Sequence, residues 1–190
     1  MKKASQKIPA KLIIFDLDDT LFDTTGQLKG SWDGIPFITP FEGVKEMLGQ
    51  LPAKKVLVSQ GNSDIQNKKI DVLGIRSFFD EIVLCSSDAE KHACFAKILA
   101  HFNITDPLDV IVVGNRLDSE VRYGKMLGCK TAWVRHGKYA DRTPVDAFEE
   151  PDFTVLKTIE VENLLKQGAA EDSGFFKGDI IVTEHANPSH

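Results

Sequence analysis

Two carboxylates separated by one residue are the groups in this chain best suited to chemistry. Asp16 and Asp18 directly follow the apolar run 12–15, which has the length and composition of a buried strand. Side chains two residues apart on a strand share a face, so these carboxylates repel each other unless a cation or hydrogen-bond donors compensate them. Mg²⁺ binds through such carboxylates together with substrate phosphate. The pair indicates a magnesium site with a nucleophilic carboxylate, and an Asp-rich turn is the alternative.

Groups that could bind phosphate follow two later apolar runs. Ser59, Gln60 and Gly61 come at the end of the run 55–59. They offer a hydroxyl and several backbone N–H groups to a phosphate, although all three are also ordinary turn residues. Lys91 follows the run 81–85, near the expected start of a helix. It could bind phosphate too, although most lysines at such positions are solvated.

Oxygen-bearing side chains follow the fourth apolar run, 109–113. They are Asn115, Asp118 and Glu120. Amide and carboxylate oxygens suit a hard cation such as Mg²⁺. Asp118 has a second interpretation, because an acid at this point can cap the helix that follows.

The elements that must position these groups alternate along the chain. Apolar runs predict strands at 12–15, 55–59, 81–85, 109–113, 131–134 and 153–156. Helical periodicity appears between them at 43–51, 65–73, 93–102, 119–127 and 159–166. This alternation predicts an α/β fold, a three-layer, doubly wound and mostly parallel sheet with helices on both faces. Ligands in such a sheet bind beyond the carboxyl ends of the strands, so the four groups of polar residues should converge on one edge.

At this point the chain resembles the haloacid dehalogenase-like (HAD) hydrolase superfamily over roughly residues 12–137. Four motifs carry the resemblance: Asp16-x-Asp18-x-Thr20 after a strand, Ser59, Lys91, and Gly114-Asn115 with Glu120. The resemblance implies a Rossmann-like core and a phosphatase-type member of the superfamily. An acid at Asp18 also separates this chain from the dehalogenating members, which the resemblance implies do not use one there.

The resemblance implies an Mg²⁺-dependent phosphomonoester hydrolase that works through an aspartyl-phosphate. Asp16 would be the nucleophile and a metal ligand. Asp18 would act as general acid and then as base, and its main-chain carbonyl would bind Mg²⁺. Ser59 and the next two amides would bind the transferring phosphoryl group, and Lys91 would offset its charge.

Asn115 departs from the pattern, because the resemblance implies an Asp metal ligand at this position. An amide oxygen still binds Mg²⁺ but removes one negative charge, so we expect weaker Mg²⁺ binding. Asp118 and Glu120 are expected to support the metal site indirectly or through water. The substitution also keeps an alternative function open, that of a catalytically weak or silent binding or regulatory subunit.

The domain organisation is expected to be simple. Residues 1–166 form a single hydrolase domain, and 167–190 form a tail that is partly disordered, with a strand-like run at 179–183. Only residues 21–40 separate the first motif from the first helical segment, and their glycines and lack of helical period predict a flap loop in place of a cap. We expect an open site that admits large phosphorylated substrates.

Composition narrows the class of protein further. The 190 residues carry a net charge of −5, which argues against a broad nucleic-acid-binding patch. No apolar stretch is long enough to span a membrane. Three cysteines without a paired spacing favour reduced thiols and a cytoplasmic location. The five histidines form no metal-binding pattern in the sequence, and a homo-oligomer is left open.

Overall fold

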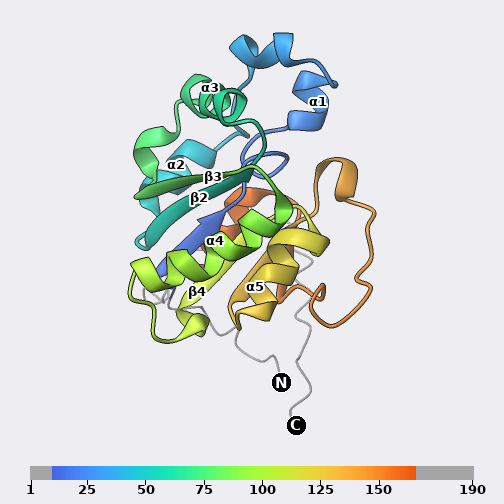
Figure 1. Cartoon of the computed structure of the whole chain (residues 1–190). Coiled ribbons are helices and arrows are strands. Elements are labelled where there is room, and N and C mark those ends of the chain that lie inside the picture. The colour runs from blue at the N-terminus through green and yellow to red at the C-terminus, as the bar shows by residue number, and fades with distance from the viewer. Residues whose placement is uncertain (1–9, 166–190) are drawn as a thin grey trace, which may run out of the picture.

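Six parallel strands form the centre of the molecule (Figure 1). The structure, a computed structural model, describes residues 10–165. The strands are β1 Leu12–Phe15, β2 Lys54–Gln60, β3 Glu81–Cys85, β4 Val110–Gly114, β5 Lys130–Val134 and β6 Phe153–Val155. Their order across the sheet is β3-β2-β1-β4-β5-β6. The predicted α/β class and the parallel sheet are therefore confirmed.

Helices cover both faces of this sheet, as Figure 1 shows for α4 and α5 on the near face. The principal helices are α2 Val44–Gln50, α3 Ser63–Leu73, α4 Asp88–His101, α5 Arg122–Met126 and α6 Val161–Leu165. Alternation along β1 divides the core, because Ile13 and Phe15 pack with α2, α3 and α6, whereas Leu12 and Ile14 pack with α4 and α5. The result is the three-layer arrangement that the sequence predicts.

The strand order reverses direction between β1 and β4. The chain winds from β1 outward through β2 to β3, and then crosses back to β4 beside β1. Phe15 pairs with Val113, and the Asp16 N–H donates to the Val113 carbonyl at 2.9 Å. This reversal is the point where a doubly wound sheet opens a crevice for ligands, so the fold itself puts Asp16 at a binding position.

Some helices begin at residues other than those expected from the sequence. Two helices start earlier than their apolar periodicity because polar side chains cap them. Asn62 accepts from the N–H groups of Asp64 and Ile65 at the start of α3, and Ser87 accepts from Glu90 at the start of α4. The expected helix 119–127 is divided into a π-helical turn, η4 Leu117–Val121, followed by α5.

Residues 21–40 contain two short helical segments, which differs from the plain loop expected there. They are α1 Thr24–Leu28 and the 3₁₀ helix η1 Trp32–Phe37. Asp23 caps the first and Ser31 caps the second, so local hydrogen bonds replace the missing apolar period. We call residues 21–40 the flap segment. Its action as a flap stays a prediction, as does the division into domains, and the expected tail 167–190 lies outside the described residues.

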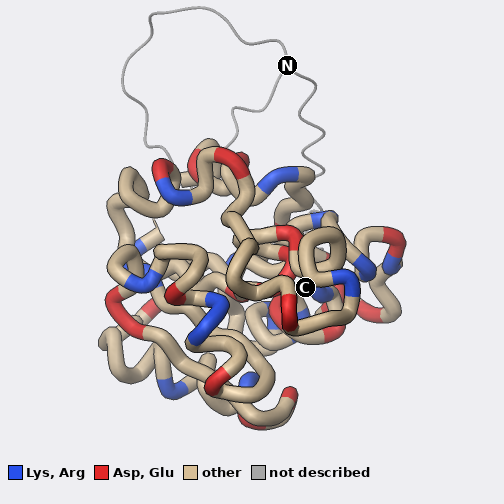
Figure 2. The backbone as a smooth tube through the Cα atoms, turned by 90° about the horizontal axis from the view of Figure 1, so that it is seen from above, with Lys and Arg blue, Asp and Glu red and all other residues tan. Residues whose placement is uncertain are grey.

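The remaining described elements are short 3₁₀ turns between the larger ones. They are η2 Arg76–Phe78, η3 Pro107–Asp109, η5 Gly137–Tyr139 and η6 Thr158–Glu160. Within residues 10–165, no helix is long and apolar enough to cross a membrane. Figure 2 shows Lys and Arg interspersed with Asp and Glu rather than gathered on one side.

Candidate active site

A cavity of about 650 Å³ lies where the carboxyl ends of the central strands meet the flap segment. The residues from the predicted motifs that line it are Asp16, Asp18, Gln60, Gly61, Lys91, Asn115 and Glu120. The flap contributes Thr24, Thr25, Leu28, Lys29, Gly30 and Trp32. Further lining residues are Asp19, Lys69, Arg116, Lys138 and Tyr139. The structure therefore brings most of the predicted site residues together around one open cavity.

Asp16, Lys91 and Glu120 form a buried charged triad at the base of this cavity. The Lys91 ammonium lies 2.7 Å from Asp16 Oδ1 and also contacts Glu120 Oε1. All three side chains are less than 10% exposed. One ammonium thus pairs with two carboxylates, which leaves the triad with an excess of negative charge.

The electrostatics of the triad follow from its burial and from this imbalance. Burial raises the pKa of Asp16 to about 7; the Lys91 charge opposes this rise, and the charges of Glu120 and Asp18 add to it. Burial by itself would lower the pKa of Lys91, but the charges of Asp16 and Glu120 outweigh it and raise that pKa above its ordinary value. Lys91 therefore stays protonated. When Asp16 ionises, its buried carboxylate would be stabilised by positive charge in addition to that of Lys91.

Asp18 is held by three side chains that the sequence analysis did not single out. Thr24 Oγ1 and Lys69 Nζ each lie 2.7 Å from Asp18 Oδ1, and Gln66 Nε2 donates to Asp18 Oδ2 at 2.8 Å. Thr24 begins α1 in the flap segment, whereas Gln66 and Lys69 lie one turn apart on α3. Asp18 thus connects the flap to a core helix.

Ser59 lies just behind the cavity and is not among the residues that line it. Its side chain is buried, and its Oγ accepts from Gln66 Nε2 at 2.6 Å. Gln60 and Gly61, the next residues along the chain, do reach the cavity. The Gly61 N–H donates to the Cys85 carbonyl, so this amide is already paired with β3.

Asn115 is buried at the end of β4 and lines the cavity across from β1. Its backbone carbonyl accepts from Trp133 Nε1 at 3.0 Å, which fixes the turn that carries it. The preceding residue must be glycine, because a Cβ on Gly114 would collide with the side chain of Glu120. This close approach is what lets Glu120 reach Lys91.

The donor set suits a hard divalent cation. Asp16 offers a carboxylate, Asn115 an amide oxygen and Asp18 a main-chain carbonyl, all at the same cavity, and oxygen atoms of these kinds are the ligands that Mg²⁺ prefers. Such an ion would neutralise the excess negative charge of the buried triad.

Asp118 lies outside this group. Its carboxylate pairs with Arg116 Nε at 3.0 Å, and the Arg116 guanidinium is also 3.8 Å from Asp88. The Arg116 side-chain hydrogen bond and charge help to hold the pKa of Asp118 below its usual range, against the effect of its burial. Of the two acids expected to support the metal site, Glu120 touches Lys91 and Asp118 instead orients Arg116 at the rim.

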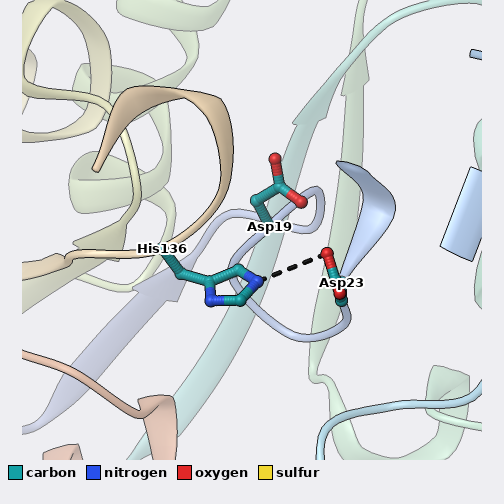
Figure 3. Close-up of side chains that lie close together, drawn as sticks. All are labelled: Asp19, Asp23 and His136. Carbon is teal, nitrogen blue, oxygen red and sulfur yellow. Dashed lines mark ion pairs between the residues drawn. The ribbon is translucent and has the colours of Figure 1, made fainter. Parts of the chain in front are cut away.

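A second cluster lies beside the first, formed by Asp19, Asp23 and His136 (Figure 3). One ligand atom from each of the three lies within 4.8 Å of the others, so they could hold a metal ion. His136 Nε2 is 3.3 Å from Asp23 Oδ1, while both Asp19 oxygens accept from Thr25. The histidines form no metal-binding pattern in the sequence. This cluster is not apparent there because His136 comes from a loop more than 100 residues away in the chain.

The residues that sequence reasoning missed share a weak signal. Gln66 and Lys69 are three positions apart and are buried on the inner face of α3, where apolar residues are expected. Polar residues at buried helical positions are unusual without a partner. A closer count of the helical face would have identified them as candidates, but only the fold reveals that their partner is Asp18.

The comparisons with known proteins agree with this geometry. The family model of the haloacid dehalogenase-like hydrolases matches residues 29–134. A glyceraldehyde 3-phosphate phosphatase of Pyrococcus furiosus is 29% identical over 119 residues, which cover 61% of this chain and 49% of the relative. An N-acylneuraminate-9-phosphatase of Mus musculus is 26% identical over 136 residues, covering 66% of this chain and 51% of the relative. The chain therefore spans about half the length of these curated relatives.

Solved structures share the fold. The L-2-haloacid dehalogenase of Xanthobacter autotrophicus matches with a TM-score of 0.62 at 15% identity, covering 82% of this chain and 98% of that one. The HAD-hydrolase YfnB of Bacillus subtilis, in a structure bound to magnesium, matches with a TM-score of 0.66 at 14% identity, covering 83% and 99%.

The six-stranded parallel sheet, the acidic cavity at its switch point and the family match together define the class. This chain belongs to the haloacid dehalogenase-like hydrolases. Membership in the superfamily that the sequence motifs resemble is confirmed, and so is a core without a sizeable cap. The matched segment begins after Asp16 and Asp18, so the first motif is independent of that match.

Proposed function

We propose that this protein is an Mg²⁺-dependent phosphomonoester hydrolase that forms an aspartyl-phosphate on Asp16. The observation that carries the proposal is the buried pair of Asp16 and Lys91, 2.7 Å apart, at the base of a cavity that Asp18 also lines. A carboxylate nucleophile, a fixed cation and a second carboxyl group are the groups that this reaction needs.

In the first step, an Asp16 carboxylate oxygen attacks the phosphorus of the substrate. A bond forms between that oxygen and phosphorus, and the bond between phosphorus and the leaving oxygen breaks. Asp18 gives its proton to the leaving alkoxide, which departs as an alcohol. The Lys91 ammonium, held between Asp16 and Glu120, stabilises the negative charge of the transferring phosphoryl group.

In the second step, Asp18 is the base. It takes a proton from a water molecule, whose oxygen attacks the phosphorus as the bond to the Asp16 oxygen breaks. Inorganic phosphate leaves, and both aspartates return to their starting states. Ser59 and Gln60 lie next to this path and would bind the phosphoryl oxygens, whereas the Gly61 N–H, expected to join them, is paired with the Cys85 carbonyl.

Asp16, Asn115 and the Asp18 carbonyl would hold Mg²⁺. The ion would supply a Lewis acid that polarises the phosphoryl group and neutralises its charge. Support for magnesium comes from the oxygen donor set and from YfnB, which shares the fold and was solved with that metal.

The substrate is proposed to be a phosphorylated small or larger molecule. Relatives are named for glyceraldehyde 3-phosphate and N-acylneuraminate 9-phosphate. The cavity is open, which supports the expectation that large phosphorylated substrates can enter. A cytoplasmic location and self-association stay predictions. The three cysteines, on which the expected location rests, are free thiols in the structure.

Hydrolysis of an aryl phosphate with and without Mg²⁺ tests the proposal, with Asp16→Asn as the control. We expect turnover that requires Mg²⁺ and that the substitution abolishes. Turnover that survives in Asp16→Asn would contradict the assignment of the nucleophile.

Asn115 favours one alternative, a silent binding or regulatory subunit. It lies at the cavity where the resemblance implies an aspartate ligand. A folded wild-type protein that binds phosphate analogues but hydrolyses no phosphomonoester at high Mg²⁺ would support this alternative.

A further inference from the structure

We propose that Gln66 and Lys69 are positioning residues that hold the Asp18 carboxyl group as the general acid, and that Gln66 also directs the Ser59 hydroxyl. This inference rests on the proposed function, because it assigns roles to two residues through Asp18 and Ser59. Neither residue belongs to the four motifs, and both come from α3.

The first observation is that donors occupy both oxygens of Asp18. Lys69 Nζ and Thr24 Oγ1 contact Oδ1, and Gln66 Nε2 contacts Oδ2. A carboxyl group on a loop would otherwise sample several rotamers. Lys69 and Thr24 on one oxygen and Gln66 on the other hold the side chain in one orientation, at the cavity that also contains Asp16. Because all three are donors, they stabilise the negative charge that develops on Asp18 as it gives its proton to the leaving group.

The second observation is the environment of Lys69. Its side chain is 2% exposed, and Asp18 is its one ion-pair partner among the described residues. The rings of Trp32 and Phe22 lie 4.8 and 5.9 Å from its ammonium, so aromatic faces complete its surroundings. Burying an ammonium with a single carboxylate partner costs desolvation free energy, so stability alone does not explain this pairing.

The third observation concerns the Gln66 amide. Its nitrogen lies within hydrogen-bond distance of Asp18 Oδ2, Ser59 Oγ and the Gln60 carbonyl. The reversed amide would place its oxygen against the Asp18 carboxylate, so the nitrogen must face the site. The Ser59 oxygen accepts from this nitrogen, which leaves the hydroxyl hydrogen available for a phosphoryl oxygen.

The Gln66 amide oxygen adds a cost to the stability of the fold. It is buried and has no hydrogen-bond partner among the described residues. Burying an unpartnered polar atom destabilises a fold, and a leucine of similar size would avoid that penalty. Two unfavourable placements on adjacent turns of one helix, both directed at Asp18, point to a role in the reaction.

The experiment compares kcat/KM for two phosphomonoesters, p-nitrophenyl phosphate and an alkyl phosphate. The aryl leaving group departs without a proton, whereas the alkyl group needs the general acid. We expect Lys69→Met to lower kcat/KM for the alkyl phosphate about 100-fold more than for the aryl phosphate. Gln66→Leu should shift the same ratio in the same direction, and Lys69→Arg should restore part of it.

Asp18→Asn is the benchmark for this ratio. If Lys69 acts through Asp18, adding Lys69→Met to Asp18→Asn causes no further shift in the ratio. Lys68→Met is the matched control, since Lys68 is exposed on the same helix, and it should leave the ratio unchanged. Thermal unfolding establishes that each variant is folded.

Equal losses on both substrates, or additive losses in the double variant, would overturn the positioning role while the hydrolase proposal stands. Activity that Asp16→Asn retains on both substrates would overturn the proposed function, and with it this inference.

Discussion

The Lys91 ammonium connects the chemistry of this site to its electrostatics. It is buried between Asp16 and Glu120, and it contacts the proposed nucleophile directly. Because one positive charge faces two negative ones, a bound cation would balance the excess negative charge of the site. Sequence reasoning identified Lys91 and Asp16 but could not reveal that Glu120 shares the same ammonium.

At the residue scale, Asn115→Asp tests the metal site. The substitution adds one negative charge at a cavity that would hold Mg²⁺, so the half-saturating Mg²⁺ concentration for hydrolysis should fall about tenfold. A titration of activity with Mg²⁺ measures this. An unchanged half-saturating concentration would show that residue 115 does not contact the metal.

The raised pKa of Asp16 gives a second prediction at this scale. Its folded pKa is about 7, against an ordinary value of 3.8, because burial disfavours the charged form. The folded state therefore holds this proton more tightly than the unfolded state between these values. In metal-free protein, the stabilisation is fully present below about pH 4 and is lost as the pH rises to about 7.

Asp16→Asn removes this titration. The free energy of unfolding of the metal-free wild type should fall relative to that of the variant by roughly 3 kcal/mol across this range. Urea unfolding at several pH values measures the difference. A difference that does not change between pH 4 and pH 7 would contradict the burial argument.

At the scale of elements, the flap segment is tied to the sheet by a few polar contacts. Asp23 caps α1 through the Gly26 N–H at 2.7 Å and also pairs with His136, which follows β5. Gln27 and Thr39 exchange two hydrogen bonds that close the segment on itself. These contacts place Thr24 and Trp32 beside Asp18 and Lys69.

Asp23→Ala tests these contacts. The substitution removes the cap and the ion pair, so the free energy of unfolding should fall by about 1 kcal/mol. Urea unfolding measures the loss. Asp141→Ala is a suitable control because Asp141 is fully exposed, and it should change stability by less than about 0.5 kcal/mol. Equal midpoints for Asp23→Ala and the control would contradict the role of the cap.

The elements also show what a sequence can and cannot predict. All six strands lie where apolar runs predict them, because a buried parallel strand needs a continuous apolar segment. The flap helices were not predicted, since side-chain caps rather than periodicity define them. Gln66, Lys69 and His136 were missed because their partners are far along the chain and only the fold brings them together.

At the scale of the whole molecule, the strand order explains why the motifs meet. Asp16 and Asn115 follow β1 and β4, the adjacent strands between which the winding reverses. Ser59 lies near the carboxyl end of β2, one neighbour of β1, and α4 carries Lys91 back from the outer strand β3. Four separate segments therefore reach one cavity without a cap domain, and the flap segment forms part of its wall.

The central claim is that Asp16 carries the phosphoryl group. The most direct measurement is to mix the protein with Mg²⁺ and an aryl phosphate, reduce any acyl phosphate with borohydride, and analyse the peptides by mass spectrometry. The account predicts homoserine at position 16, dependent on Mg²⁺ and missing from Asp16→Asn. Turnover of the substrate with an unmodified Asp16, or with the modification at another residue, would contradict it.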